Sequence, residues 1–304
     1  MATARREPHR AAREAARLER IGVALERVRA SCDVGARVDA DPVGVVHRYA
    51  RPLDRELVGL VAALIAFGNV KTIRAKLEDA MRRIGASPHR AADDPAALGA
   101  RLAGWKHRVF VGDDLARLLT GARVVQRESG SLGARFAAEL AAKGTVREAL
   151  AALADAIRAH GRLTSKTRRG PAHLLPDPRR SSGSKRLFLY LRWMVRPADG
   201  VDLGLWPVDP AVLLCPVDTH IHKLARNLGF TRRRDLSWTT TEEITRALAR
   251  YDPADPVKYD FALCHLGMLQ GGPSRRDPVR CEGCGIKDVC RHWTEDRRPR
   301  SEPH

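Results

Sequence analysis

The sequence predicts an all-α protein, and three observations support this fold class. Aromatic residues make up only 5% of the chain, whereas Ala and Leu are abundant. Apolar residues recur at the spacing of helical faces, between residues that are typical of helix caps. No stretch shows convincing alternation of apolar and polar residues, the pattern of strands. The 304 residues suffice for one large domain or for two smaller lobes.

The first third of the chain contains three predicted helices after a basic segment. Residues 1–20 are mostly Arg, Glu and Ala, which predicts a basic arm, either a frayed helix or a disordered segment. An apolar stripe predicts a helix over 21–32. The next helix takes Asp54 as its N-cap and Glu56 as an acid of its first turn, and its almost wholly apolar body predicts burial. An amphipathic helix follows over 70–85.

The middle of the chain alternates between irregular and helical segments. Residues 86–112 are rich in Pro and Ala and contain the basic and aromatic stretch "WKHRVF", which is interpreted either as a nucleic-acid contact or as the edge of an amphipathic helix. Gly, Pro, Ser and Arg dominate Gly161–Arg186, which predicts a loop or a set of turns. Periodic segments predict helices over 113–127, 131–142, 145–160 and 185–196.

The stretch "CPVDTHIHKLARNLG" predicts a helix with a defined start and a defined end. It follows an extended connector, residues 198–217, that contains three prolines. Asp218 stands where an N-cap belongs, and Gly229 stands where a left-handed C-terminal residue belongs. The open question is whether the carboxylate of Asp218 only caps the helix or also takes part in chemistry.

Two more helices are predicted before the C-terminal segment. A capping box formed by Thr240 and Glu243 predicts the start of the first. The second, "DPVKYDFALCHLG", takes Asp255 as N-cap and Pro256 as its first residue, with Gly267 just past its end.

The charge and the apolar runs indicate which partners to expect. The formal net charge is +18, and of the 54 basic residues nine are Lys and 45 are Arg. A strongly basic surface attracts phosphate backbones, although genomic base composition is an alternative explanation for the Arg and Ala content. Residues 1–20 contain no secretory signal, and the longest apolar run, Leu57–Phe67, is too short to span a bilayer. We therefore expect a cytoplasmic protein without a membrane partner; no protein partner is predicted.

Three of the six cysteines are close together near the C-terminus, as Cys281, Cys284 and Cys290. Disulfides are rare in cytosolic proteins. The spacing C-x2-C-x5-C instead indicates a metal site.

Three separated features resemble one superfamily. They are the buried helix that ends in "AFGNV", Lys185 in "SSGSKRLFLYLRW", and "PVDTH" followed by "CEGCGIKDVC". In this order they resemble the helix-hairpin-helix DNA glycosylases of the endonuclease III type, over about residues 53–290. The long interval between Lys185 and Asp218 is more similar to the archaeal 8-oxoguanine glycosylases. The whole chain most closely resembles a bacterial family of conserved hypothetical proteins of unknown function. The hairpin departs from the superfamily pattern, because only Gly183 of the usual glycine pair is present.

The resemblance implies a two-lobed helix-hairpin-helix glycosylase-like fold with a C-terminal cysteine loop. A six-helix lobe would span 53–197, with the hairpin-like turn near 181–186. The second lobe would combine 21–52 with 205–295 and include the cysteine loop 281–290. Residues 296–304 would form a basic tail.

The resemblance also implies catalytic roles for Lys185 and Asp218, placed across a cleft between the lobes. Cleavage of an N-glycosidic bond develops positive charge on the sugar, which a carboxylate stabilises. A lysine amine with a lowered pKa can attack the anomeric carbon and form a Schiff base, which permits β-elimination of the strand. The target base must first be flipped out of the duplex. The alternatives are that Asp218 is a plain N-cap and that Lys185 is a solvated or phosphate-binding residue.

The partner is expected to be DNA, with RNA as an alternative. Phe67 stands where endonuclease III has a residue that inserts into the base stack. Core packing is nevertheless the favoured explanation for the phenylalanine at this position. The residues expected to contact nucleic acid are Phe67, Asn69, Arg168, Arg169, Arg179, Arg180, Gly183 and Arg186.

The cysteine loop lacks the first ligand of the superfamily pattern, because Ser274 occupies that position. Serine is a poor ligand for soft metals. One interpretation is a [4Fe–4S] cluster with Cys264 as the fourth ligand. A second is zinc, held by the three thiolates with His292 or His265. The third is a loop without metal.

Two other functions compete with base excision. One is a DNA- or RNA-binding protein that keeps the scaffold without the chemistry; the missing hairpin glycine and the missing first cysteine favour it. The other is an RNA-directed enzyme that acts on bases, because a basic groove alone does not distinguish DNA from RNA.

Overall fold

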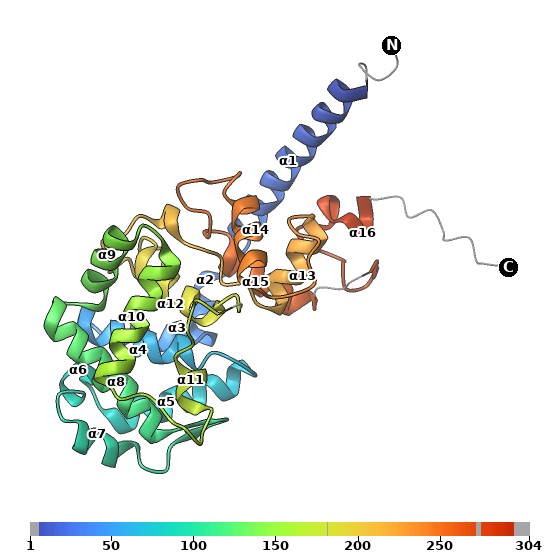
Figure 1. Cartoon of the computed structure of the whole chain (residues 1–304). Helices are drawn as coiled ribbons and strands as arrows, with labels where there is room; N and C mark the ends of the chain where they lie inside the picture. The colour runs from blue at the N-terminus through green and yellow to red at the C-terminus, as the bar shows by residue number, and fades with distance from the viewer. Residues whose placement is uncertain (1–5, 181, 272–274, 295–304) are drawn as a thin grey trace. The chain divides into compact units, whose positions relative to one another are not determined.

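The computed structural model describes residues 6–180, 182–271 and 275–294, and the regular secondary structure of this part of the chain is almost all α-helix (Figure 1). The predicted all-α class is therefore confirmed. The chain divides into two compact units, of which the larger comprises residues 33–216 and the smaller comprises residues 1–32 and 217–304. The predicted tail, 296–304, and Ser274 lie outside the described residues.

The larger unit contains eleven of the described α-helices, one 3-10 turn and a short hairpin. The helices are α2 (Val34–Ala40), α3 (Val43–His47), α4 (Pro52–Leu64), α5 (Val70–Ile84), α6 (Pro88–Ala91), α7 (Pro95–Leu102), α8 (Gly112–Ser129), α9 (Leu132–Lys143), α10 (Val146–His160), α11 (Gly170–Leu174) and α12 (Lys185–Val195). The remaining elements are β1 (Lys106–His107), β2 (Phe110–Val111) and the 3-10 turn η1 (Pro210–Val212).

Helix α4 lies in the core of the larger unit. All of its residues from Glu56 to Leu64 are buried, as its apolar sequence predicts. It packs against α12 at Gly59, where an added Cβ would lie 2.5 Å from the Met194 methyl group, so the small residue permits the close approach. Helices α8, α9 and α10 pack against one another beside it (green in Figure 1).

The start of α4 differs from the prediction. The helix begins at Pro52, and Asp54 lies inside its first turn rather than at the cap. The carboxylate of Asp54 is buried and accepts hydrogen bonds from the backbone N–H of His89 at 2.9 Å and from its ring Nδ1 at 2.8 Å. A proline at the first helical position needs no partner for its missing N–H, which explains why the helix begins there.

The stretch "WKHRVF" forms a short hairpin rather than the edge of an amphipathic helix, and its contact with nucleic acid stays a prediction. It contains the antiparallel strands β1 and β2, joined by Arg108 and Val109, with His107 paired to Phe110. Arg108 has a φ of 55°, in the left-handed region that a tight connection requires. Two strands of two residues each are too short to show an alternating pattern in the sequence.

The smaller unit combines the two ends of the chain. Its helices are α1 (Arg6–Ala30), α13 (Thr219–Leu228), α14 (Trp238–Leu248), α15 (Asp260–Gln270) and α16 (Arg291–Thr294), with the 3-10 turn η2 (Lys287–Val289). Helix α1 is continuous from Arg6, which agrees with the helical alternative for residues 6–20 of the predicted arm. Helix α1 packs on α15, and its Arg27 side chain donates to the Gly285 carbonyl and the Asp288 carboxylate of the cysteine loop.

The boundary between the units also differs from the predicted lobes. Residues 33–52, assigned to the second lobe, belong to the larger unit, because α2 packs on α3 and α3 packs on α4. The connector 198–216 belongs there too, and Leu203 and Leu205 donate backbone hydrogen bonds to carbonyls at the end of α12.

Two predicted caps in the smaller unit are replaced by neighbouring residues. Helix α14 begins at Trp238 with Ser237 as its cap, whose hydroxyl accepts from the Thr240 N–H, so Thr240 is not the cap. Helix α15 begins at Asp260, after turns over 256–259, and Gly267 lies inside it. By contrast, the Asp218 cap and the left-handed Gly229 of α13 are confirmed.

Among the helices that the structure describes, none combines the length and apolar character that a membrane crossing requires.

Candidate functional site

The two oxygens of the Asp218 carboxylate have different partners. Oδ1 accepts the backbone N–H groups of His220 and Ile221, both at 2.9 Å, and so satisfies two donors that the first turn of α13 leaves open. Oδ2 accepts the thiol of Cys264 at 3.5 Å. The side chain is half-buried. Capping therefore uses one oxygen of Asp218 and leaves the other outside the helix cap.

The packing of α13 on α15 brings Cys264 to Asp218. Gly267 lies one turn after Cys264, and an added Cβ there would lie 2.9 Å from the Cβ of His220. Any larger residue would push the two helices apart. The glycine inside α15 thus has a packing role in place of the predicted capping role.

Lys185 is the first residue of α12 and is half-buried. The residue before it, Ser184, is only 4% exposed and has a φ of 49°, a left-handed conformation that costs a non-glycine residue roughly 1–3 kcal/mol. Gly183 is buried. Such strain occurs often at functional sites, and here it fixes the direction in which the chain enters the helix.

Lys185 lies in the larger unit and Asp218 in the smaller one. Their predicted convergence on one substrate remains a prediction.

An aromatic and cationic cluster surrounds Phe67 in the larger unit. The ring of Phe67 lies 5.0 Å from the guanidinium carbon of Arg108 and 5.3 Å from that of Arg186. The ring also packs edge-on against two histidine rings. The distance between ring centroids is 5.5 Å for His107 and 5.2 Å for His173. Phe67 is therefore partly packed, as the favoured interpretation predicted, yet it is not fully buried. We refer to these five residues as the Phe67 cluster.

Arg186 has a structural role in the Phe67 cluster. Its guanidinium donates to the backbone carbonyls of Leu64, at the end of α4, and of His173. A cation at a helix C-terminus is favourable because carbonyl groups point there. Burial lowers the pKa of Arg186 to about 10. The Arg186 side chain thus ties the start of α12 to the end of α4, and its predicted phosphate contact stays a prediction.

Burial lowers the pKa of both His107 and His173 in the Phe67 cluster, which favours their neutral forms. His107 is 3% exposed, and its Nε2 has no hydrogen-bond partner among the described residues. The positive charge of the cluster therefore comes from its two arginines.

Arg108 is the exposed cation of the Phe67 cluster. Among the described residues no carboxylate lies within ion-pair distance of it. An added Cβ on Gly68 would lie 2.6 Å from its Nη1, so Gly68 leaves the room that the guanidinium occupies. The sequence indicated this residue only through the basic and aromatic composition of "WKHRVF".

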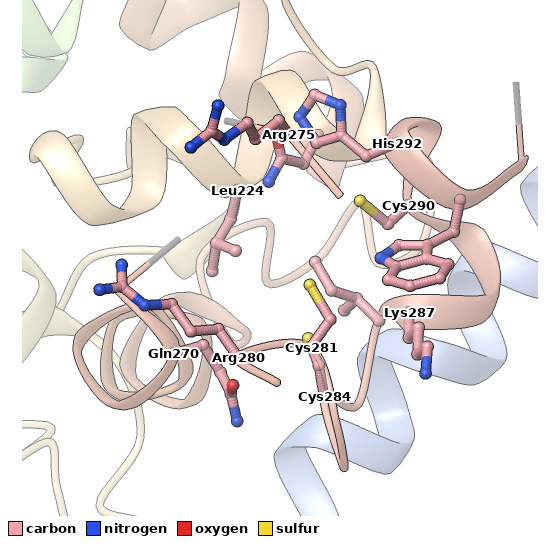
Figure 2. Close-up of a pocket in the computed structure, with 12 residues that line it drawn as sticks. Leu224, Gln270, Arg275, Arg280, Cys281, Cys284, Lys287, Cys290 and His292 are labelled. Atoms are coloured by element: carbon pink, nitrogen blue, oxygen red, sulfur yellow. The ribbon is translucent and has the colours of Figure 1, made fainter. Parts of the chain in front are cut away.

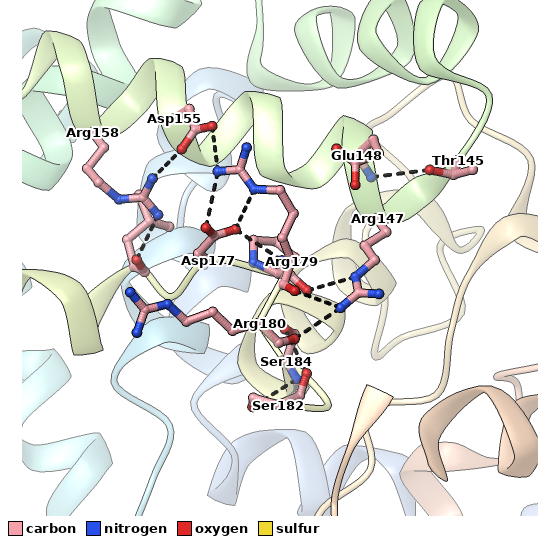
Figure 3. Close-up of polar contacts among 12 residues, drawn as sticks. Thr145, Arg147, Glu148, Asp155, Arg158, Asp177, Arg179, Arg180, Ser182 and Ser184 are labelled. Carbon is pink, nitrogen blue, oxygen red and sulfur yellow. Dashed lines mark hydrogen bonds and ion pairs between the residues drawn. The ribbon is translucent and has the colours of Figure 1, made fainter. Parts of the chain in front are cut away.

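Two predicted phosphate-binding arginines already have carboxylate partners. Arg168 binds the fully buried Asp114 with both Nη atoms, at 2.9 and 2.7 Å. Arg179 binds Asp177 and Asp155, both at 2.8 Å (Figure 3), and these carboxylates raise its pKa. Charges that are compensated in this way attract phosphate less strongly.

The other predicted contacts are exposed. Arg169 and Arg180 both have exposed side chains, and the Arg180 carbonyl accepts a hydrogen bond from Arg147. Asn69 is the N-cap of α5, where its Oδ1 accepts the N–H groups of Lys71 and Thr72.

The three clustered cysteines line one cavity of the smaller unit (Figure 2). His292 lines the same cavity, whereas neither Cys264 nor His265 is among the lining residues. The Nδ1 atom of His265 is hydrogen-bonded to the Phe261 carbonyl at 2.9 Å. The structure therefore brings together three of the four predicted ligands and directs Cys264 elsewhere.

The donor set partly fits a metal. Thiolates and imidazole suit zinc, and thiolates suit iron–sulfur clusters. Burial raises the pKa of Cys284 and Cys290, which favours the protonated thiols, whereas metal binding would need their thiolates. Among the residues described, however, no group of three or more Cys, His, Asp and Glu side chains is placed so as to hold a metal ion. A cluster or zinc at this cavity remains a prediction.

Comparison with known proteins identifies the family. No curated protein and no solved structure matches the chain. A family model with the description "Protein of unknown function (DUF2400)" matches residues 41–269, which is more than half of the chain. The matched region includes Phe67, Lys185, Asp218 and Cys264 and ends before the cysteine loop. As the resemblance to conserved hypothetical proteins predicted, the chain belongs to a family of unknown function, DUF2400.

Proposed function

We propose that the chain is a DNA base-excision glycosylase with an associated strand-cleaving lyase activity. The observation that supports this best is the divided use of the Asp218 carboxylate, whose Oδ1 caps α13 while Oδ2 lies outside the cap. One oxygen is sufficient for the cap, so capping and a second role of Asp218 are compatible. A carboxylate with one oxygen outside the cap can stabilise positive charge on a sugar.

In this mechanism Lys185 is the nucleophile. Its neutral amine attacks the anomeric carbon of a flipped nucleotide, and the glycosidic C–N bond breaks with its electron pair on the departing base, which takes up a proton. Asp218 stabilises the positive charge that develops on the sugar. The Schiff base that forms on Lys185 then permits β-elimination of the 3′ phosphate.

The Phe67 cluster supports nucleic acid as the substrate. Aromatic rings interleaved with cations are typical of surfaces that bind nucleic-acid strands. The bond from Arg186 to the Leu64 carbonyl places the start of α12, where Lys185 lies, beside the end of α4 that leads to Phe67. Within the larger unit, the proposed nucleophile therefore adjoins the proposed DNA-contacting surface.

Borohydride trapping tests the proposed chemistry. We expect the full-length chain to form a reducible covalent adduct with a duplex oligonucleotide that contains the correct lesion or an abasic site. Lys185→Ala abolishes the adduct because the nucleophile is gone, whereas Lys166→Ala, which removes an exposed lysine of the preceding loop, retains it. Asp218→Asn keeps the cap and slows base release by roughly 100-fold or more.

The main alternative is a DNA- or RNA-binding protein without catalysis. Ser184 favours it, because a non-glycine residue stands in a left-handed conformation at the hairpin-like turn. Tight, salt-sensitive binding without an adduct on any lesion would establish this alternative and exclude the glycosylase.

Binding to DNA gives a prediction for Arg108. Arg108→Gln removes a cation without a carboxylate partner, so we expect the variant to bind a duplex oligonucleotide more weakly. When the logarithm of the affinity is plotted against the logarithm of the salt concentration, the slope should become less steep by about 1. Arg82→Gln is the matched control, because the exposed Arg82 side chain pairs with Asp79. Fluorescence anisotropy at several salt concentrations measures both slopes. Equal slopes for the two variants would remove Arg108 from the interface.

A further inference from the structure

We propose that Cys264 is a positioning residue for the Asp218 carboxylate rather than a metal ligand. This inference rests on the proposed function, because the role of Asp218 in it is catalytic. The thiol holds Oδ2, the oxygen outside the helix cap, in a fixed direction while the backbone N–H groups of α13 hold Oδ1.

The position of the thiol is built into the helix packing. Cys264 lies on α15, and its contact with Asp218 depends on how closely α15 approaches the start of α13. Gly267 lies on the same helix and packs against His220, which is two residues after Asp218. A Cβ added to Gly267 would clash with the His220 side chain. One glycine therefore sets the distance between the two helices at the level of the carboxylate.

The geometry of the pair argues against metal binding by Cys264. Its thiol donates to Oδ2 of Asp218, with a distance of 3.5 Å between sulfur and oxygen. Cys264 is also absent from the lining of the cavity that Cys281, Cys284 and Cys290 share.

A thiol suits the positioning role because it is a weak donor. The S–H group is neutral and donates weakly, so it orients the carboxylate oxygen without adding a positive charge of its own. Cys264 touches neither the sugar nor the base in this arrangement and acts only through Asp218.

Two variants test the role through the rate of base release. Cys264→Ala is expected to lower the single-turnover rate about 3- to 10-fold, as for the loss of one weak hydrogen bond, without a change in DNA affinity. Cys264→Ser restores most of the rate because its hydroxyl donates to the same oxygen. The iron and zinc content of both variants stays equal to that of the wild type. A wild-type rate in Cys264→Ala, or a loss of metal from it, overturns the inference.

A second measurement does not depend on activity. The alkylation rate of Cys264 at pH 8, followed by mass spectrometry of its peptide, is expected to rise several-fold in Asp218→Asn, because the thiol loses the carboxylate oxygen that accepts its hydrogen bond. Asn keeps the helix cap, so the fold is retained. Equal alkylation rates in the wild type and in Asp218→Asn would show that the thiol does not bind the carboxylate, whether or not a substrate is known. The proposed function fails by a different result, the absence of any Lys185-dependent adduct in the wild type.

Discussion

Replacing Glu56 by Gln is expected to lower the free energy of unfolding by roughly 3 kcal/mol or more, although the two side chains have the same shape. Glu56 is 2% exposed and is the fifth residue of α4. Its Oε1 accepts the Gly133 N–H at 3.0 Å and the Trp206 indole N–H at 2.8 Å. Its Oε2 accepts the Gln126 amide at 2.8 Å and the Leu132 N–H at 3.0 Å.

Each oxygen of Glu56 therefore receives two donors, and an amide cannot replace either oxygen. In both orientations of Gln, its NH2 group would face two N–H groups and leave both without an acceptor. Buried donors without partners are costly, and the lost charge at the N-terminus of α9 adds to the cost. Burial raises the pKa of Glu56, and the four donors oppose this rise.

Urea denaturation followed by circular dichroism measures the effect of Glu56→Gln. Glu148→Ala is the control, because Glu148 is an exposed first-turn acid of α10, and we expect it to change the free energy of unfolding by about 0.5 kcal/mol or less. A Glu56→Gln variant as stable as this control would contradict the four-donor arrangement.

Replacing Asp202 by Ala is expected to cost about 3–5 kcal/mol, the usual cost of removing one partner from a buried ion pair. Asp202 is 1% exposed and lies between two arginines of the larger unit. Arg192, itself 2% exposed, donates to its Oδ2 at 3.2 Å, and Arg196 donates to the same oxygen. The substitution removes the carboxylate that joins these two buried guanidinium groups.

The pH dependence of Asp202 has a definite sign. Burial raises its pKa from 3.8 to about 6, and the two guanidinium groups oppose that rise. Because the folded chain binds this proton more tightly than the unfolded chain, the contribution of Asp202 to the free energy of unfolding falls as the pH rises from about 4 to about 6. It is constant at higher pH.

Denaturation of the wild type and of Asp202→Asn over this pH range isolates the contribution of Asp202. Because Asn does not titrate, the difference between the two free energies of unfolding should change with pH only through Asp202. Asp113→Ala is the control for the cost at neutral pH: Asp113 forms an exposed pair with Arg117, and its loss should cost less than about 1 kcal/mol. A flat difference curve, or equal costs for Asp202→Ala and Asp113→Ala, would show that the carboxylate of Asp202 is not buried between the arginines.

The outcome for α13 shows what local patterns determine. Asp218 as cap and Gly229 as left-handed end follow from sequence alone, because a cap binds N–H groups two or three residues away. The apolar run of α4 likewise predicted a buried helix. For the same reason the all-α class and the spans of the long helices were predictable.

Contacts between distant segments were decided only by the tertiary structure. Glu56 was interpreted as a helix-end acid, because nothing near it in the sequence reveals donors from Gln126, Leu132, Gly133 and Trp206. Cys264 was grouped with the cysteines nearest in sequence, yet its partner is 46 residues away.

The sequence by itself determined the helical class, most helix spans and the caps of α13, because these depend on hydrogen bonds within a few residues. Only the tertiary structure decided which polar side chains meet, where the two units divide and how Arg108 and Arg186 flank Phe67. Such pairings depend on the packing of entire helices, and a small residue such as Gly59 or Gly267 sets that packing without leaving a local pattern.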